Sequence, residues 1–292
     1  MSDRLDVPVR GGSLATYRFG STRADAPLVL AIHGITSTSR AWLAVGRALG
    51  DRAALIAVDL RGRGRSNELP GPFGIEAHVD DLLVLLDHFD LQQAVIAGHS
   101  LGAYVAAALA NGNPGRVRSL VLVDGGLTIP GSESVDAQVF IEDFLGPTFR
   151  RLKAEFEDSQ HYRDWWAAHP AFASSDVDRE LLARYADHDL VGQPPRMRSS
   201  VNPEAVRVDG LDLFKAPNAS SIEVPAVLLC APRGMVDDPN PMQPLAIVQE
   251  WASRDRSRRR AVEVPGVNHY TIAFGPGGAR VVATEIVAAL AG

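Results

Sequence analysis

A serine between glycines, Gly98-His99-Ser100-Leu101-Gly102, is the strongest chemical signal in the sequence. It follows the short apolar run Ala94–Ala97 and precedes an alanine-rich stretch of helical character, Leu101–Ala110. A serine at a sharp strand-to-helix turn presents its hydroxyl beyond the end of the strand, and the flanking glycines leave room for the strained backbone. The pattern therefore predicts that Ser100 is a nucleophile.

A serine nucleophile needs donors for the negative charge that develops on the carbonyl oxygen under attack. The Leu101 N–H lies at the start of the predicted helix, where unpaired N–H groups favour negative charge. We expect the second donor to be the Ile35 N–H, because Gly34 after the apolar run Leu28–Ile32 lets the chain turn back toward the serine. His33 beside this turn is expected to make a structural hydrogen bond, with a catalytic role as the less favoured alternative.

The serine also needs a base within hydrogen-bond reach. His269 follows the last apolar run, Ala261–Val264, which places it at the same sheet edge as the serine turn. It is therefore the predicted base. His99 is expected to serve the turn itself. The remaining histidines lie in polar helical or loop contexts that are typical of solvated side chains: His78, His88, His161, His169 and His188.

Around these residues, short apolar runs alternate with amphipathic segments. The runs are rich in Val, Ile and Leu without polar alternation, which is typical of strands covered on both faces of a parallel sheet. Helices are expected over Ile75–Phe89 and Val281–Leu290. The alternation predicts an α/β fold with a doubly covered, mostly parallel sheet. The predicted strands are Leu28–Ile32, Ala53–Val58, Ala94–Ala97, Leu120–Val123, Ala226–Cys230 and, more weakly, Ala261–Val264.

The alternation ends after Asp124. Residues 125–215 show no convincing strand run and carry helical patterns rich in aromatic side chains. We therefore predict a helical insertion at 125–215 in a core domain formed by residues 1–124 and 216–292. Most of its aromatic rings are expected to pack in the core of the insertion, and a minority to line a substrate pocket. The candidates for substrate binding are Phe140, Phe144, Trp165 and Trp166.

Together, the serine turn, the His-Gly turn and the late histidine resemble the α/β-hydrolase superfamily over residues 14–124 and 225–290. The stretch Asp59–Ser66 is similar to the D-x-R-G-x-G-x-S loop of that family, with Arg63 at a position often held by a second histidine. In the family, a helical insertion caps the active site. The resemblance implies that role for residues 125–215.

The resemblance leaves the acid of the catalytic triad open between two places. Members most often carry an aspartate in a G-x-x-D stretch after the late core strand, but here that position holds Gly234. Asp237 and Asp238 follow shortly afterwards and form one alternative. Asp124, at the end of the preceding core strand, matches the other location used in the superfamily and is favoured, although many members carry a non-catalytic aspartate there.

These residues predict an α/β-fold serine hydrolase of the carboxylesterase-like class (EC 3.1.1) that cleaves a hydrophobic ester through an acyl-enzyme. The chemistry requires no metal and no organic cofactor. A lactonase, a carbon–carbon bond hydrolase or a cofactor-free perhydrolase on the same triad is an alternative, and a non-catalytic small-molecule receptor is a further one. Haloalkane dehalogenases and epoxide hydrolases are disfavoured, because they use a carboxylate where this chain has Ser100.

The aromatic insertion favours a hydrophobic small-molecule ester or lactone as the partner, and the composition argues against other classes of partner. A net charge of −6 argues against binding to nucleic acid or to an anionic membrane surface. The single cysteine, Cys230, excludes an intrachain disulfide and a thiolate metal site. The charged first residues lack a secretory apolar stretch, and no run approaches the roughly 18 apolar residues that span a bilayer. We therefore expect a cytoplasmic protein without membrane insertion. The sequence makes no prediction of the oligomeric state.

Overall fold

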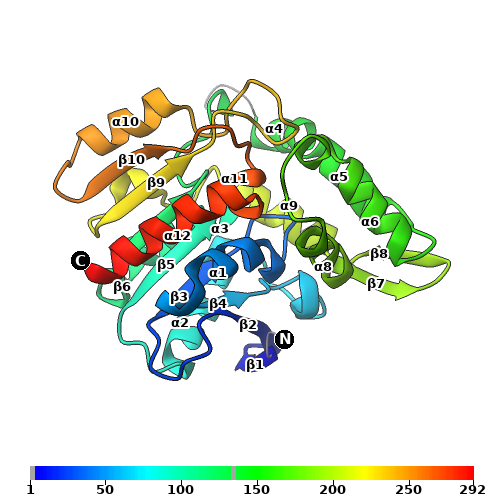
Figure 1. Cartoon of the computed structure of the whole chain (residues 1–292), viewed down its shortest axis with the longest axis horizontal. Helices are drawn as coiled ribbons and strands as arrows, with labels where there is room; N and C mark the ends of the chain where they lie inside the picture. The colour runs from blue at the N-terminus through cyan, green and yellow to red at the C-terminus, as the bar shows by residue number, and fades with distance from the viewer. Residues whose placement is uncertain (1–3, 133–135) are drawn as a thin grey trace.

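The computed structural model describes residues 4–132 and 136–292, without the side chains of residues 140, 142–144, 147 and 148 (Figure 1). An 8-stranded sheet of order β1-β2-β4-β3-β5-β6-β9-β10 forms its centre. The strands from β4 to β10 in this order pair in parallel, whereas β1 and β2 pair antiparallel. The strands of this sheet are β1 (Arg4–Val9), β2 (Gly12–Gly20), β3 (Leu28–Ile32), β4 (Ala54–Val58), β5 (Ala94–His99), β6 (Val117–Val123), β9 (Ala226–Cys230) and β10 (Arg259–Glu263).

Helices cover both faces of this sheet (Figure 1). Alternate side chains of a strand point to opposite faces. Ala31 of β3 belongs to an apolar cluster with the helices α1 and α12, whereas Leu30 and Ile32 belong to a second cluster with α2, α3 and α10. Because both faces are buried there, the inner strands β3, β4 and β9 are apolar throughout, whereas the edge strands β1 and β10 carry charged residues. The predicted α/β fold with a doubly covered, mostly parallel sheet is thus confirmed.

The helices range from single turns to a C-terminal helix of 16 residues, α12. A proline in its first turn starts α12 earlier than the predicted Val281. In the part of the chain that the structure describes, no helix has the length and apolar character needed to cross a membrane. The helices are α1 (Leu43–Leu49), α2 (Ile75–His88), α3 (Leu101–Gly112), α4 (Ala137–Phe144), α5 (Gly146–Lys153), α6 (Ser159–Ala168), α7 (Pro170–Ala173), α8 (Arg179–Asp189), α9 (Pro203–Asp212), α10 (Leu245–Ser253), α11 (Thr271–Phe274) and α12 (Pro276–Ala291).

The segment between β6 and β9 contains the helices α4 to α9, which gather at one side of the sheet in Figure 1. It also contains a small antiparallel pair, β7 (Leu190–Gln193) and β8 (Arg196–Ser199). The expectation of no strand within residues 125–215 is therefore wrong. Each strand has four residues; half of the eight are polar and only two are buried, so the pair leaves no apolar run in the sequence. The division into a core domain and a separate cap domain stays a prediction.

Three glycines allow close backbone packing at the end of β5. A Cβ atom on Gly98 would lie 2.2 Å from the carbonyl oxygen of Gly102, and one on Gly102 would lie 2.2 Å from that of Ile32. A Cβ atom on Gly125, just after β6, would lie 2.5 Å from the carbonyl oxygen of Ser100. Real Cβ atoms do not approach backbone this closely, so only glycine fits these positions.

Glycine-to-alanine substitutions at the two ends of α3 should therefore change the free energy of unfolding in opposite directions. Gly102→Ala should lower the free energy of unfolding by at least about 3 kcal/mol, because its Cβ meets rigid backbone of β3. Gly112→Ala at the other end of α3 has no atom within 4 Å of the new Cβ, and should raise the free energy of unfolding by roughly 0.5 kcal/mol. Urea unfolding followed by circular dichroism measures both. Equal effects of the two substitutions would contradict the packing described here.

Candidate active site

Ser100 occupies the turn between β5 and α3. Its φ of 54° and ψ of −121° lie in a region that side-chain-bearing residues rarely adopt. The backbone holds this conformation through two hydrogen bonds, from the Ser100 N–H to the Val123 carbonyl at 3.0 Å and from the Ala103 N–H to the Ser100 carbonyl at 2.9 Å. The strand–turn–helix geometry predicted around Ser100 is present, and the serine is partly exposed.

His269 and Asp124 meet in the interior beside this turn. Nδ1 of His269 lies 2.7 Å from Oδ2 of Asp124, and the two residues are only 3% and 1% exposed. The other oxygen of Asp124 accepts a hydrogen bond from the Ala231 N–H at 3.0 Å. Because a carboxylate only accepts, Nδ1 of His269 carries the proton and donates it to Asp124. This tautomer leaves Nε2 of His269 free to accept a proton.

The alternative acids lie elsewhere. Asp237 pairs with the exposed side chain of Arg233 at 2.7 Å, and this contact lowers the pKa of the Asp237 carboxyl. Asp238 accepts a hydrogen bond from the Asn240 N–H at 2.9 Å. Among the hydrogen bonds described, neither carboxylate bonds to His269. The structure thus brings Asp124, and neither Asp237 nor Asp238, to the imidazole.

A small cavity of about 30 Å³ is lined both by the residues of the predicted oxyanion donors and by two residues of the predicted triad. Ile35, Ser100, Leu101 and Asp124 all line it. The space corresponds to about one water molecule. Ile129, Leu145 and Leu213, from the segment between β6 and β9, form part of its other walls.

His33 makes the structural hydrogen bonds expected of it. Its Nε2 accepts from the Leu60 N–H at 3.0 Å, so its Nδ1 donates to the Gly34 carbonyl at 2.7 Å. Burial lowers the pKa of His33 to about 4. The Gly34 carbonyl also accepts from the Ser37 N–H at 3.1 Å. In a trans peptide the N–H points opposite to the carbonyl, so these two bonds also orient the Ile35 N–H.

His99 has a contact that the sequence did not reveal. Its Nε2 donates to the backbone carbonyl of His269 at 2.8 Å, and the two rings lie 4.8 Å apart. Burial, together with the neighbouring His269, lowers the pKa of His99 to about 3. His99 therefore stays neutral and fixes the backbone of the predicted base. Its place inside the serine turn was the only sequence signal for this role.

Asp59 anchors the loop that resembles the D-x-R-G-x-G-x-S pattern. Its carboxylate accepts from the Ser39 N–H at 2.7 Å, from the Arg65 N–H at 2.9 Å and from Nε2 of His188 at 2.7 Å. Burial raises the pKa of this carboxyl, but the hydrogen bonds from His188 and Arg65 outweigh it and hold the pKa well below its usual range. His188, expected to be solvated, is buried instead, because it is the partner of Asp59.

A larger cavity of about 430 Å³ lies next to this site. Trp165 and Trp166 line it, together with Tyr270, which follows His269 in the chain. Met235 lines both the large and the small cavity. Trp166 is only 1% exposed and packs mostly in the core, whereas Trp165 is partly exposed. The two other predicted substrate contacts, Phe140 and Phe144, have side chains outside the described part of the structure.

Several lining residues were missed at the level of sequence. Met235, Met242 and Gln243 come from the loop after β9, and Tyr104 comes from α3. The position of that loop at the carboxyl end of a core strand was the available signal, since loops at this edge line the sites of parallel sheets. Among residues 4–132 and 136–292, no group of three or more His, Cys, Asp or Glu side chains is placed to hold a metal ion.

Known proteins resemble this chain in sequence over part of its length. A family model described as alpha/beta hydrolase fold matches residues 27–216, more than half of the 292-residue chain. Lipase LipV of Mycobacterium tuberculosis is 35% identical over 158 residues, which are 53% of this chain and 58% of that protein. A 2-(acetamidomethylene)succinate hydrolase of Mesorhizobium japonicum is 36% identical over 102 residues, 35% of this chain and 37% of the relative. The chain thus matches less than two thirds of the length of either relative.

A solved structure resembles the whole chain. The crystal structure of an E-2-(acetamidomethylene)succinate hydrolase superposes with a TM-score of 0.79 and covers 100% of both chains. The sequence identity is 21%, so this likeness shows the fold.

The buried histidines predict that the protein loses stability in acid. The pKa values of His33 and His99 fall from 6.5 to about 4 and about 3 on folding, so below pH 6.5 the unfolded chain binds more protons than the folded one. The free energy of unfolding should therefore fall as the pH drops through this range, by roughly 3 kcal/mol for His33 and roughly 5 kcal/mol for His99 when complete. The lowered pKa of Asp59 adds a further loss below its ordinary 3.8. Urea unfolding at several pH values measures the slope.

The matched control is His99→Gln, which removes one of the titrating groups. Its free energy of unfolding should depend less steeply on pH between about pH 6.5 and pH 4. An unfolding free energy that is independent of pH over this interval in the wild-type protein is the result that contradicts the expectation.

Proposed function

Because the chain belongs to the alpha/beta-hydrolase family, we propose that it is a serine hydrolase that cleaves a carboxylic ester of a hydrophobic small molecule. The observation that carries the proposal is the 2.7 Å hydrogen bond between His269 and Asp124, in the same pocket region as the strained Ser100 turn. A buried carboxylate that fixes the imidazole tautomer is what an activated serine requires.

The proposed reaction has two halves. The Ser100 hydroxyl attacks the ester carbonyl carbon while Nε2 of His269 accepts its proton, and the Asp124 carboxylate stabilises the resulting imidazolium. The N–H groups of Ile35 and Leu101 hold the negative oxygen, and each such donor contributes about 3 kcal/mol in comparable sites. His269 then passes its proton to the leaving alcohol. Water repeats the attack on the acyl-enzyme, which releases the acid and restores Ser100.

The large cavity supports a hydrophobic substrate. Its wall presents Trp165, Trp166 and Tyr270. Arg151 also lines it, but the guanidinium is 2.9 Å from the buried carboxylate of Asp189, so its charge is matched inside the protein. The three aromatic side chains, with the neutralised Arg151 beside them, favour an apolar acyl or aryl group on their side of the cavity. Arg150 lines the cavity as a second cation. A lactone is an internal ester and would react by the same steps.

The names of the relatives are compatible with hydrolysis of this kind. One is called a lipase and another a hydrolase of a succinate derivative. Both names denote cleavage by water, and they differ in substrate. We therefore propose hydrolysis as the reaction and assign the substrate class from the cavity wall of this chain.

Substitutions in the triad should separate chemistry from folding. Ser100→Ala should abolish hydrolysis of p-nitrophenyl butyrate and covalent labelling by a fluorophosphonate. Asp124→Asn should lower kcat by about 10⁴-fold, because the amide cannot hold the productive tautomer. Asp238→Asn, the matched control on the alternative acid, should stay within about twofold of the wild type, because the hydrogen bond described for its carboxylate goes to backbone of its own loop. Steady-state rates and mass spectrometry of the labelled protein measure these outcomes.

Full activity of folded Ser100→Ala would sink the proposal. A large loss in Asp238→Asn with none in Asp124→Asn would move the acid to the loop after β9. Binding of an apolar ligand by wild-type protein that neither hydrolyses esters nor reacts with a fluorophosphonate would favour a receptor.

The aromatic wall predicts a selective effect on large substrates. Trp165→Ala should raise KM for p-nitrophenyl octanoate about tenfold and leave KM for the acetate within about twofold, because only the long chain reaches this wall. Phe89→Ala is a suitable control, since this partly buried ring packs beside α2 and lines neither cavity. It should not change the ratio of the two KM values. Equal KM changes for both esters in Trp165→Ala would remove the large cavity from substrate binding.

A further inference from the structure

The turn that carries the proposed oxyanion donor is held by its carbonyl groups. We call residues 34–37 the oxyanion turn. The Ile35 carbonyl accepts a hydrogen bond from Nε of Arg63 at 3.0 Å. The next carbonyl, that of Thr36, accepts one from Nη2 of Arg151 at 3.0 Å. Two arginine side chains from distant parts of the sequence thus bind consecutive carbonyls of one turn.

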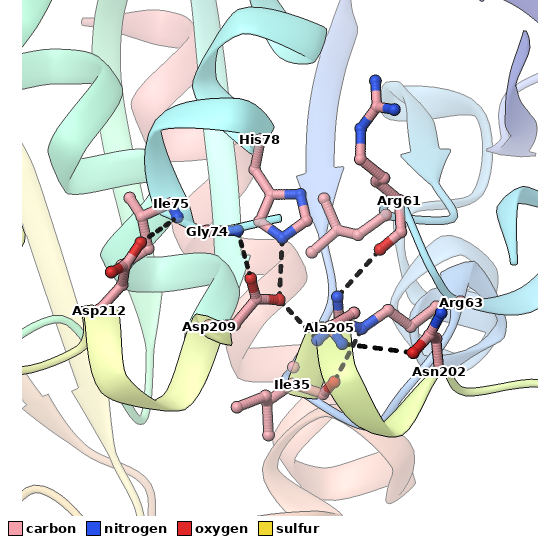
Figure 2. A network of polar contacts seen from close by, with 12 residues as sticks. Ile35, Arg61, Arg63, Gly74, Ile75, His78, Asn202, Ala205, Asp209 and Asp212 are labelled. Carbon is pink, nitrogen blue, oxygen red and sulfur yellow. Dashed lines mark hydrogen bonds and ion pairs between the residues drawn. The ribbon is translucent and has the colours of Figure 1, made fainter. Parts of the chain in front are cut away.

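Arg63 is buried with a matching carboxylate. The side chains of Arg63 and Asp209 are both 0% exposed, and Nη2 of Arg63 lies 2.6 Å from Oδ2 of Asp209 as an ion pair without hydrogen-bond alignment. Asp209 also accepts from Nε2 of His78 at 2.9 Å and from the Gly74 N–H at 2.8 Å. Figure 2 shows Asp209 among Gly74, His78 and Arg63, with Ile35 close by. Despite its burial, Asp209 has a pKa well below its usual range because of Arg63 and His78.

Arg151 has an equivalent partner. Its Nη1 lies 2.9 Å from Oδ2 of Asp189 and 2.7 Å from the Tyr162 hydroxyl. Asp189 is fully buried and also accepts from the Ser200 hydroxyl at 2.8 Å. That hydroxyl in turn accepts from the Gly64 N–H at 3.0 Å, next to Arg63 in the chain. The two arginine–aspartate pairs are therefore linked to each other.

The groups around the oxyanion turn come from two different parts of the chain. The oxyanion turn and Arg63 belong to loops after the core strands β3 and β4. Arg151 on α5, Asp189 at the end of α8 and Asp209 on α9 all come from the segment between β6 and β9. The segment that also lines the substrate cavity therefore supplies three of the four charges around the oxyanion turn.

Stability alone gives no reason for two buried ion pairs here. Removing two charges from water costs several kcal/mol, and well-packed apolar residues in their place are often at least as stable. What the arginines add is geometry, because a guanidinium presents donors in a rigid fork. With the Gly34 carbonyl already held by His33 and Ser37, all three peptide planes of the turn are fixed. An oxyanion donor acts only when it is preorganised in this way.

We propose that Arg63 and Arg151, together the arginine clamp, are positioning residues: by holding the Ile35 and Thr36 carbonyls they fix the two peptide planes that follow the Ile35 N–H, and so keep this donor in the orientation that the Gly34 carbonyl gives it. Asp209 and Asp189 keep the two guanidinium groups in place. The inference rests on the proposed function, which makes the Ile35 N–H a donor. The clamp also reaches the substrate cavity, because Arg151 lines its wall and lies 5.0 Å from the Trp166 ring.

The chain offers a matched control in a third buried arginine–aspartate pair. Arg61 and Asp81 are 2.7 Å apart with side chains only 2% and 5% exposed. The guanidinium of Arg61 donates to the carbonyls of Pro70 and Arg10 and makes no hydrogen bond to the oxyanion turn among the bonds described. Asp81→Asn therefore removes a buried carboxylate of the same kind that itself makes no described bond to the clamp; the one described link between the two pairs is the Arg61 backbone carbonyl, which accepts from Nη1 of Arg63 at 2.9 Å.

The test compares Arg63→Lys, Asp209→Asn and Asp189→Asn with Asp81→Asn and the wild type. Lysine keeps the charge opposite Asp209 but loses the fork that reaches the Ile35 carbonyl. Prolonged fluorophosphonate labelling counts the competent sites in each preparation. The rate of p-nitrophenyl butyrate hydrolysis is then expressed per labelled site, together with KM and the Kd of an alkyl boronic acid, whose serine adduct carries the oxyanion.

The three clamp variants should lose about 100-fold in kcat per labelled site, with KM within about threefold of the wild type and a similar rise in the Kd of the boronic acid. Asp81→Asn should lower Tm about as much as the clamp variants do, but it should keep kcat per labelled site within about threefold of the wild type. Unchanged kcat per site in any two folded clamp variants, or an equal loss in Asp81→Asn, overturns the inference. Should Arg63→Lys fail to fold, the two aspartate variants decide. Wild-type protein that neither hydrolyses p-nitrophenyl butyrate nor reacts with the fluorophosphonate contradicts the proposed function. The inference about the clamp then fails as well, because it rests on that function.

Discussion

The close approach of three chain segments at the carboxyl ends of β3, β5 and β6 is the constraint on which the site depends. These strands are neighbours in the sheet, so the turn after β3, the serine turn and Asp124 meet without any long connection. Gly98, Gly102 and Gly125 let the segments come within van der Waals contact of each other. The left-handed φ of 54° at Ser100 follows from the same crowding, because the chain has to reverse direction within one residue.

Buried polar side chains then fix the parts of these turns that the close backbone packing does not hold. His33 ties the turn after β3 to the Leu60 N–H, and His99 ties the serine turn to the carbonyl of His269. Both imidazoles stay neutral because burial lowers their pKa values. The charged side chains of Arg63 and Arg151 likewise fix the backbone, because they donate hydrogen bonds to two consecutive carbonyls of the oxyanion turn. The region between β6 and β9 is therefore joined to the core by directional bonds as well as by apolar contact.

This arrangement divides the proposed chemistry between two parts of the chain. The sheet and its turns supply Ser100, His269 and Asp124, which are suited to ester hydrolysis in general. The wall of the larger cavity comes mainly from α5, α6 and the loop after β9, and its aromatic rings are the proposed determinants of substrate choice. Met235 lines both cavities, so that loop borders the proposed substrate cavity and the space beside the serine.

The sequence by itself determined the fold class, the strand–turn–helix at Ser100 and the position of His269 after the last core strand, because each depends on short-range patterns. It favoured Asp124 but kept Asp237 and Asp238 as alternatives, since a pattern of spacing does not measure a distance between side chains. It missed β7 and β8, which are too short and polar to form an apolar run. Only the tertiary structure placed Asp124 at 2.7 Å from His269. Only the tertiary structure paired Arg63 with Asp209, because the two are far apart in sequence and each, read alone, is an ordinary charged residue.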